Sequence, residues 1–138
     1  MKSFKIGDLQ IPVPIVQGGM GIGISLSGLA SAVASAGGIG TIATVGVGLI
    51  YGTHEKSFKQ NNIDDVLYEI RKARTLTKGV LAANIMSVNY CIADALLSAY
   101  YGEFDSGFAF SGANGHKIKS ITSVKEVFHR FISDYKKK

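Results

Sequence analysis

The sequence has little cysteine and little proline, and one long part of it has no charge. The lone Cys91 cannot form an internal disulfide. The opening residues are polar and contain Asp8, which is unlike a secretory signal. We therefore expect a reducing, cytoplasmic environment, in which Cys91 is a small buried residue.

No charged residue occurs between Leu9 and Thr53. A bilayer can be crossed by about 20 apolar residues, so this stretch is long enough to span one. However, serine, threonine and glutamine interrupt it, and eleven of the 17 glycines lie between Gly18 and Gly52. Parallel strands covered on both faces also form continuous apolar runs. We therefore predict a buried interior with tight turns and no membrane association.

The chain carries a net charge of +5, and three of its lysines are the terminal residues 136–138. The remaining basic residues do not form a face with interleaved aromatic side chains, so no nucleic-acid partner is predicted. A length of 138 residues with 46% hydrophobic side chains is typical of one domain with a buried core.

The apolar pattern predicts strands at residues 11–16, 38–44 and 80–86, with helices between them. Pro12 and Pro14 restrict the first strand to an edge or a strand start. Ser25 or Ser27 offers an N-cap to the first helix, which is expected to end at Gly37. This β-α-β-α-β order indicates an α/β fold with parallel strands and right-handed crossovers.

The second helix is expected to begin at Asn62 as its N-cap, with Asp64 and Asp65 in the first turn near the positive end of the helix dipole. Its predicted buried stripe consists of four apolar residues, Ile63, Val66, Leu67 and Ile70.

The carboxyl-terminal part is expected to hold a short helix from about Asn89 to Gly102, a brief apolar run at residues 108–110 and a final helix from about Val124. Ser123 and Glu126 form a capping-box pattern at the start of that last helix. Its apolar face is predicted to consist of Val124, Val127, Phe128, Phe131 and Tyr135.

Residues 14–21 (PIVQGGMG) and 37–40 (GGIG) closely resemble the opening of nitronate monooxygenases, also called 2-nitropropane dioxygenases, and of the related flavin-dependent enoyl reductases. In that family a glycine-methionine loop reaches the flavin. Glycines suit this role because they let backbone amides approach a flat ring or a phosphate closely. Residues 83–86 (ANIM) resemble the family segment whose asparagine hydrogen-bonds FMN. The resemblance therefore implies FMN as cofactor, bound by Gly18, Gly19, Met20 and Asn84.

Residues 90–96 and 108–114 resemble the carboxyl end of the same family. The family fold is the (β/α)8 TIM barrel, which typically needs about 250 residues. The resemblance therefore implies a partial (β/α)8 barrel with about half missing and a junction near Asn89. Residues 1–89 would hold barrel units one to three, and residues 90–138 a carboxyl-terminal helical segment of the same domain.

The family's Gly-Gly-His segment, with its catalytic histidine, and its phosphate-binding glycine loops have no counterpart in this chain. No catalytic residue is therefore carried over. His54, His116 and His129 are interpreted as surface or capping residues, and no metal-ligand spacing joins them.

The function implied by the resemblance is FMN-dependent oxidation of small carbon acids such as alkyl nitronates with oxygen, impaired in so short a chain. Two alternatives stay open. One is a non-catalytic half-barrel that self-associates through exposed sheet edges, or a degenerate fragment. The other is a related flavin-dependent enoyl reductase.

Overall fold

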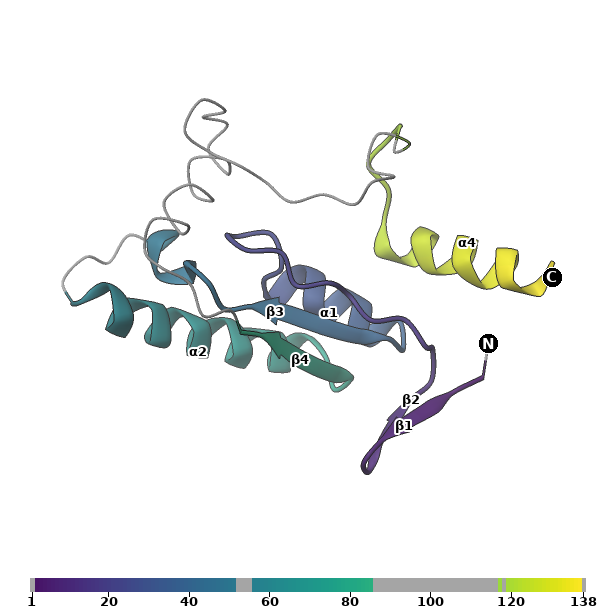
Figure 1. Cartoon of the computed structure of the whole chain (residues 1–138), viewed down its shortest axis with the longest axis horizontal. Helices are drawn as coiled ribbons and strands as arrows, with labels where there is room; N and C mark the ends of the chain where they lie inside the picture. The colour runs from purple at the N-terminus through teal and green to yellow at the C-terminus, as the bar shows by residue number, and fades with distance from the viewer. Residues whose placement is uncertain (1, 52–55, 86–116, 118, 138) are drawn as a thin grey trace.

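The computed structural model describes residues 2–51, 56–85, 117 and 119–137 (Figure 1). Predictions that fall on residues 86–116, including Cys91, His116 and the junction near Asn89, lie outside the described residues, as does His54. No described helix is long and apolar enough to cross a membrane. The elements in chain order are β1 (Phe4–Ile6), β2 (Leu9–Ile11), α1 (Ser27–Ser35), β3 (Ile39–Ala43), the 3-10 turn η1 (Val47–Leu49), α2 (Phe58–Leu76), β4 (Val80–Asn84) and α4 (Val124–Lys136).

The chain opens with a β-hairpin that the sequence pattern did not predict. β1 pairs antiparallel with β2, with Phe4 opposite Ile11. Gly7 supports the two-residue turn with a φ of +56°, a conformation that glycine adopts without a steric penalty. Ile11 therefore belongs to the hairpin, and the prediction that it begins the first parallel strand is wrong.

The main sheet is parallel. β3 and β4 pair in register from Ile39 opposite Val80 to Ala43 opposite Asn84. The predicted strands at 38–44 and 80–86 are confirmed over these residues, except that Met86 lies outside the described residues. Parallel pairing requires the helical crossover that α2 supplies.

A first parallel segment, residues 15–17, runs along the other edge of β3. The amide of Ile39 donates to the carbonyl of Ile15 (2.9 Å), and the amide of Gln17 donates to the carbonyl of Ile39 (3.0 Å). Val16 and Ile39 form an isolated parallel bridge. The predicted first strand is thus far shorter than residues 11–16, because the two prolines before it have no N–H to donate.

α1 covers β3 at unusually close range. A Cβ added to Gly40 would lie 1.8 Å from the carbonyl oxygen of Ala30, so only glycine allows this approach. Ile42, one pleat further along, joins Ala30 and Ala73 of α2 in the buried core, against which Ile70 and Leu81 also pack. Both helices therefore cover the same face of the sheet (Figure 1).

The carboxyl end of α1 agrees with the prediction, but its amino end does not. Gly37 ends the helix with a φ of +90°, and its amide donates to the carbonyl of Ala34 (3.1 Å). At the other end the N-cap residue is Leu26, which makes no side-chain cap. The predicted serine caps are wrong: the amide of Ser27 donates instead to the Glu69 carboxylate of α2, at 2.6 Å.

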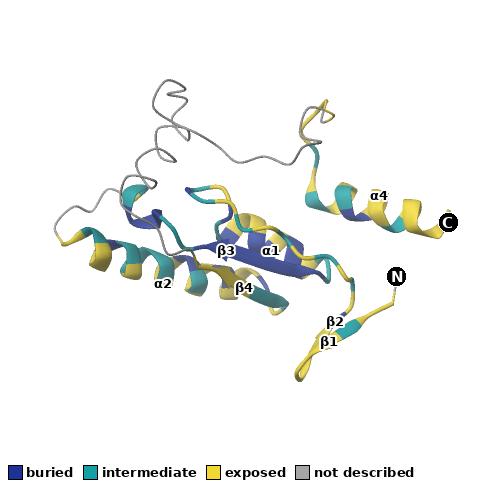
Figure 2. Cartoon of the chain, in the orientation of Figure 1, coloured by how far each residue is buried: buried dark blue, intermediate teal, exposed yellow. Residues whose placement is uncertain are grey.

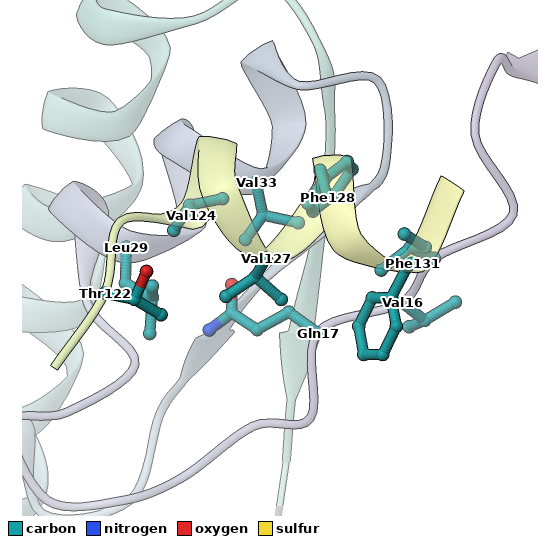
Figure 3. Close-up of a pocket in the computed structure, with 10 residues that line it drawn as sticks. Val16, Gln17, Leu29, Val33, Thr122, Val124, Val127, Phe128 and Phe131 are labelled. Carbon is teal, nitrogen blue, oxygen red and sulfur yellow. The ribbon is translucent and has the colours of Figure 1, made fainter. Parts of the chain in front are cut away.

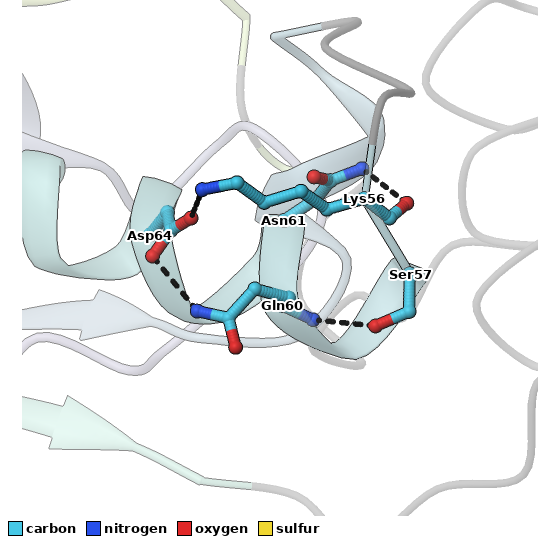
Figure 4. A network of polar contacts seen from close by, with 5 residues as sticks. All are labelled: Lys56, Ser57, Gln60, Asn61 and Asp64. Atoms are coloured by element: carbon cyan, nitrogen blue, oxygen red, sulfur yellow. Dashed lines mark hydrogen bonds and ion pairs between the residues drawn. The ribbon is translucent and has the colours of Figure 1, made fainter.

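α2 begins four residues before the predicted N-cap Asn62. The hydroxyl of Ser57 accepts a hydrogen bond from the amide of Gln60 (3.3 Å), and Lys56 forms an ion pair with Asp64 (2.8 Å). Gln60 donates to the same carboxylate, which lies in the second turn of the helix (Figure 4). The prediction of Asp64 and Asp65 in the first turn is therefore also wrong.

The buried side of α2 differs from the predicted stripe. The buried residues of α2 are Asn61, Glu69 and Ala73, whereas Ile63 and Leu67 are each 42% exposed. Apolar periodicity marked a real stripe, and Ile70 at one end of it packs against the core cluster, but Ile63 and Leu67 do not lie on the buried side of the helix. The helix buries two polar side chains because each has partners: Glu69 accepts from Ser27, and Asn61 donates to the carbonyl of Lys56.

α4 is confirmed with its cap. The hydroxyl of Ser123 accepts a hydrogen bond from the amide of Glu126 (3.2 Å), as the capping-box pattern predicted. Phe128 is buried against α1 and Gly38: a Cβ on that glycine would lie 2.9 Å from the tip of the Phe128 ring. Phe131 and Tyr135, predicted on the same face, remain about half exposed.

Candidate functional site

The carboxyl ends of the three parallel segments meet at one edge of the sheet. The glycine loop, residues 18–21, follows the first segment, Thr44 follows β3, and Asn84 ends β4. In parallel α/β sheets this edge is where loops form ligand sites. The four residues implied as FMN contacts, Gly18, Gly19, Met20 and Asn84, all lie at this edge.

Gln17 fixes the start of the glycine loop. Its side-chain oxygen accepts from the amide of Thr41 (3.1 Å), and its side-chain nitrogen donates to the carbonyl of Thr41 (3.0 Å). The side chain therefore pairs with the backbone of β3 as a neighbouring strand would. Gln17, at the end of the first parallel segment, is therefore a positioning residue.

Ser25 fixes the glycine loop through hydrogen bonds to its backbone. It is 1% exposed, and its hydroxyl accepts from the amide of Met20 (3.0 Å) and donates to the carbonyl of Gly18 (3.4 Å). The same oxygen accepts from the side chain of Gln17 (3.0 Å). The two residues on either side of Gly19 are thus both fixed to one buried side chain. Sequence reasoning treated Ser25 only as a helix cap and missed this role.

Gly19 lies directly against Asn84. A Cβ added to Gly19 would lie 2.3 Å from the Cβ of Asn84, so a larger residue would displace that side chain. Around Gly18 the space is open, with no atom within 4 Å of an added Cβ. Met20 is 36% exposed, and Asn84 is exposed. The structure therefore brings together all four predicted contacts, although Gly18 and Asn84, the first and the last of them, lie 66 residues apart in the sequence.

Two further residues hold the neighbouring loop. The amide and the hydroxyl of Thr44 both donate to the carbonyl of Asn84, at 3.1 and 3.0 Å. The side chain of Asn62 donates to the carbonyl of Thr44 (2.9 Å) and accepts from the amide of Gly48 (3.2 Å). The side chain of Asn62 therefore fixes the loop after β3 and does not cap the helix, contrary to the prediction from the sequence.

The electrostatic centre of the helix layer is Glu69, which is fully buried. Burial raises its pKa, but hydrogen bonds from Tyr51 and Ser27, together with the positive charge of Lys72, bring the pKa below its ordinary value. The pKa of Tyr51 is raised, first by burial and then by the Glu69 carboxylate that accepts its hydrogen bond. This pair joins α1, α2 and the loop after η1 and lies outside the loop edge.

A groove of about 340 Å³ lies between α1, the first parallel segment and α4 (Figure 3). Its walls are mainly apolar and include Leu29, Val33, Val127 and Phe131. The polar side chains that line it, Gln17 and Thr122, already hydrogen-bond to Thr41 and Glu126. The groove therefore offers little to orient a polar cofactor, and we assign the cofactor contacts to the loop edge.

Candidate acid-base groups are scarce among the described residues near the loop edge. Of the three histidines, the structure describes only His129, which is exposed on α4. Within the described residues, no cluster of histidine, cysteine, aspartate and glutamate could hold a metal ion. The four predicted contacts carry no titratable group, so they can position a ligand but cannot exchange a proton with it.

One protein-family model matches the part of the chain that contains the sheet and the candidate site. The matching family description is nitronate monooxygenase, and the match spans residues 2–90. A comparison with curated proteins finds no match. The matched region includes the two described parallel strands, β3 and β4, and the whole glycine loop, and it covers well over half of the 138 residues. The chain therefore belongs to the nitronate monooxygenase family.

Proposed function

We propose that this chain is an FMN-binding oxidoreductase of nitronate monooxygenase type whose cofactor contacts are Gly18, Gly19, Met20 and Asn84. The observation that carries the proposal is the packing of Gly19 against Asn84 at the carboxyl edge of the parallel sheet. Family membership makes the chain a nitronate monooxygenase-like oxidoreductase. The cofactor and the residues that hold it are our addition.

The residues at this edge fit the cofactor. A flavin is flat and needs backbone that can approach it without side chains between, which the open space at Gly18 supplies. The side-chain amide of Asn84 is exposed and has both a donor and an acceptor for a polar ring edge. Ser25 and Gln17 hold the loop rigidly, so that little order has to be gained on binding.

We further propose that the sheet is a sector of a (β/α)8 barrel. Its parallel segments follow chain order, and α1 and α2 pack together on one face, joined by the Glu69–Ser27 and Ser35–Thr77 hydrogen bonds. A barrel has this arrangement, whereas an open doubly wound sheet has helices on both faces. α4 packs beside α1, as the last helix of a closed ring would. The sector would correspond to residues 1–89, with the central units of the family fold deleted near Asn89.

When bound, FMN would supply the redox chemistry for a small carbon acid such as an alkyl nitronate. This chain would bind and orient the FMN through the backbone amides of the glycine loop and the side chain of Asn84. No described residue at the edge is placed to take a proton from such a substrate. General bases typically contribute about 10²- to 10⁴-fold, so we expect the turnover of this chain to be severely impaired.

The first experiment measures FMN affinity by calorimetry on the whole chain. We expect weak binding, because the family's phosphate-binding loops have no counterpart here. Asn84→Ala should weaken it about fivefold, since one hydrogen bond is worth about 1 kcal/mol. Gln10→Ala, which removes an exposed amide from the distant hairpin, is the matched control.

Two outcomes would count against the proposal. Equal affinity of Asn84→Ala and wild type would remove Asn84 from the site. Submicromolar binding by the monomeric chain would mean that a phosphate site exists elsewhere in it.

The second experiment measures oxygen consumption with an alkyl nitronate and added FMN. The expected rate is close to that of free FMN. A rate far above it that disappears in Asn84→Ala would overturn the expected impairment while supporting the cofactor site.

A further inference from the structure

Within the described part of the chain, the outer edge of β4 is exposed and pairs with no further strand. Among the described residues, only β3 pairs with β4. The carbonyl of Asn84 points at β3, since it accepts from Thr44. Because backbone groups alternate along a strand, the N–H and C=O groups of Leu81, Ala83 and Ile85 point to the open side. Burial decreases along the strand, and Ile85 is 81% exposed.

The sequence of this strand lacks the charged residues and the proline with which monomeric proteins often protect an exposed edge. Residues 80–85 (VLAANI) contain no charge and no proline, whereas natural edges usually carry lysine, proline or a bulge. The opposite edge of the sheet is protected in this way, because Pro12 and Pro14 precede the first parallel segment. The two edges of one sheet are therefore not equivalent, and β4 is the one open to pairing.

The apolar stripe of α2 starts at the core cluster against which β4 also packs. Ile63, Leu67 and Ile70 are spaced i, i+4 and i+7, so they share one face of the helix. Ile70 packs on the core together with Leu81 of β4, while Ile63 and Leu67 continue the stripe outward and are each 42% exposed. Arg74, one turn after Ile70, donates a hydrogen bond to the carbonyl of Gly79 (2.8 Å), the residue just before β4.

We infer that a second copy of this chain docks on the surface formed by the β4 edge and the α2 stripe. Two β4 strands would pair antiparallel across a twofold axis perpendicular to the sheet. Such an axis keeps the helices of both copies on one face, where Leu67 and Ile63 of each copy would meet their equivalents. The result is a continuous six-segment sheet in which each copy contributes its three parallel segments.

A second copy is favoured over an unrelated partner because the surface complements itself. Alternating donors and acceptors along one strand pair with the same strand turned through a twofold axis, and closed twofold dimers are the commonest assemblies. Residues 80–85, Ile63 and Leu67 carry no charge that would require an opposite charge from another protein. The inference does not depend on FMN binding, since the dimer needs no residue of the glycine loop.

The test is sedimentation velocity of the full chain at tens of micromolar. We expect a dimer of twice the 14.6 kDa chain mass. Leu67→Lys and Ala83→Pro should each raise the dissociation constant at least about tenfold. The first places a charge in the apolar stripe, and the second removes an outward N–H while leaving the bonds to β3. Leu9→Lys, an equally charged change at a 53% exposed hairpin residue, is the control and should remain dimeric.

Hydrogen exchange gives a second readout that does not need a variant. The amides of Leu81, Ala83 and Ile85 should become protected as protein concentration rises, while those of Ala82 and Asn84 should stay constant. If Ala83→Pro fails to fold, Leu67→Lys and the exchange pattern decide the question. A monomeric wild type would overturn the inference, and so would a dimer that both variants leave intact or β4 amides protected at every concentration.

Discussion

β3 and β4 are two parallel strands of five residues, paired in register, yet their surroundings differ sharply. All five residues of β3 are buried, whereas the last three of β4 are exposed (Figure 2). Both sequences are uncharged and rich in small or apolar side chains. β3 has the first parallel segment on one side, β4 on the other and α1 packed on its face, while β4 pairs, among the described residues, with β3 alone. Burial is thus set by position in the sheet more than by the residues of the strand.

The largest expected effect tests the close packing over β3. Gly40→Val should destabilise the chain by about 3 kcal/mol, because a Cβ there meets the backbone oxygen of Ala30 at 1.8 Å. Ala82→Val, on the neighbouring exposed strand, should change stability by no more than about 0.5 kcal/mol. Urea unfolding measures both variants. Similar losses at the two positions would mean that β3 and β4 are equally confined.

A smaller effect is expected from the contact that holds the helix layer over β3. Glu69→Gln should cost about 2 kcal/mol at neutral pH, since hydrogen bonds to a charged group are replaced by weaker ones. Glu126→Gln, on the exposed face of α4, should cost much less, because exposed ion pairs contribute little. Urea unfolding at neutral pH compares the two, and equal losses would contradict the role of Glu69.

The same residue predicts a pH dependence. The folded-state pKa of Glu69 lies below its ordinary value, so its contribution is complete above that value and is lost as pH falls through the lowered pKa. The free energy of unfolding of wild type should therefore decrease below about pH 4.5, the unfolded value, and Glu69→Gln should flatten part of that decrease. Parallel pH profiles for wild type and variant would show that Glu69 does not titrate as proposed.

The smallest expected effect concerns the loop edge, where the first segment reaches across β3 to the end of β4. Gly19→Ala should cost about 1 kcal/mol without cofactor, because the side chain of Asn84 has to move away. Gly18→Ala should be neutral within about 0.5 kcal/mol, since its added Cβ meets nothing. The comparison is made by urea unfolding in the absence of FMN. A larger loss at Gly18 would contradict the described loop.

Much of the fold could be predicted because its signals are local. The β-α-β-α-β order follows from alternating apolar runs and turn residues, and Gly37 ends α1 because a positive φ suits glycine. The Ser123 cap of α4 depends on residues three positions apart. The four candidate contacts came from a family resemblance, and their proximity follows from the parallel strands, whose carboxyl ends share one edge. Their role in binding FMN stays a proposal.

The sequence by itself determined most of the described strands and helices, though not the opening hairpin, and the family to which the chain belongs, since these depend on short spacings and contiguous motifs. Only the tertiary structure decided what each side chain meets. Glu69 accepts a hydrogen bond from the amide of Ser27, 42 residues away. Asn62 does not cap α2 as expected, and its side chain instead donates to the carbonyl of Thr44 in the loop after β3. Ile63 and Leu67 are partly exposed, although they belong to the apolar side of α2. Periodicity gives a helix an apolar side, but the neighbours that pack around the helix decide where that side points.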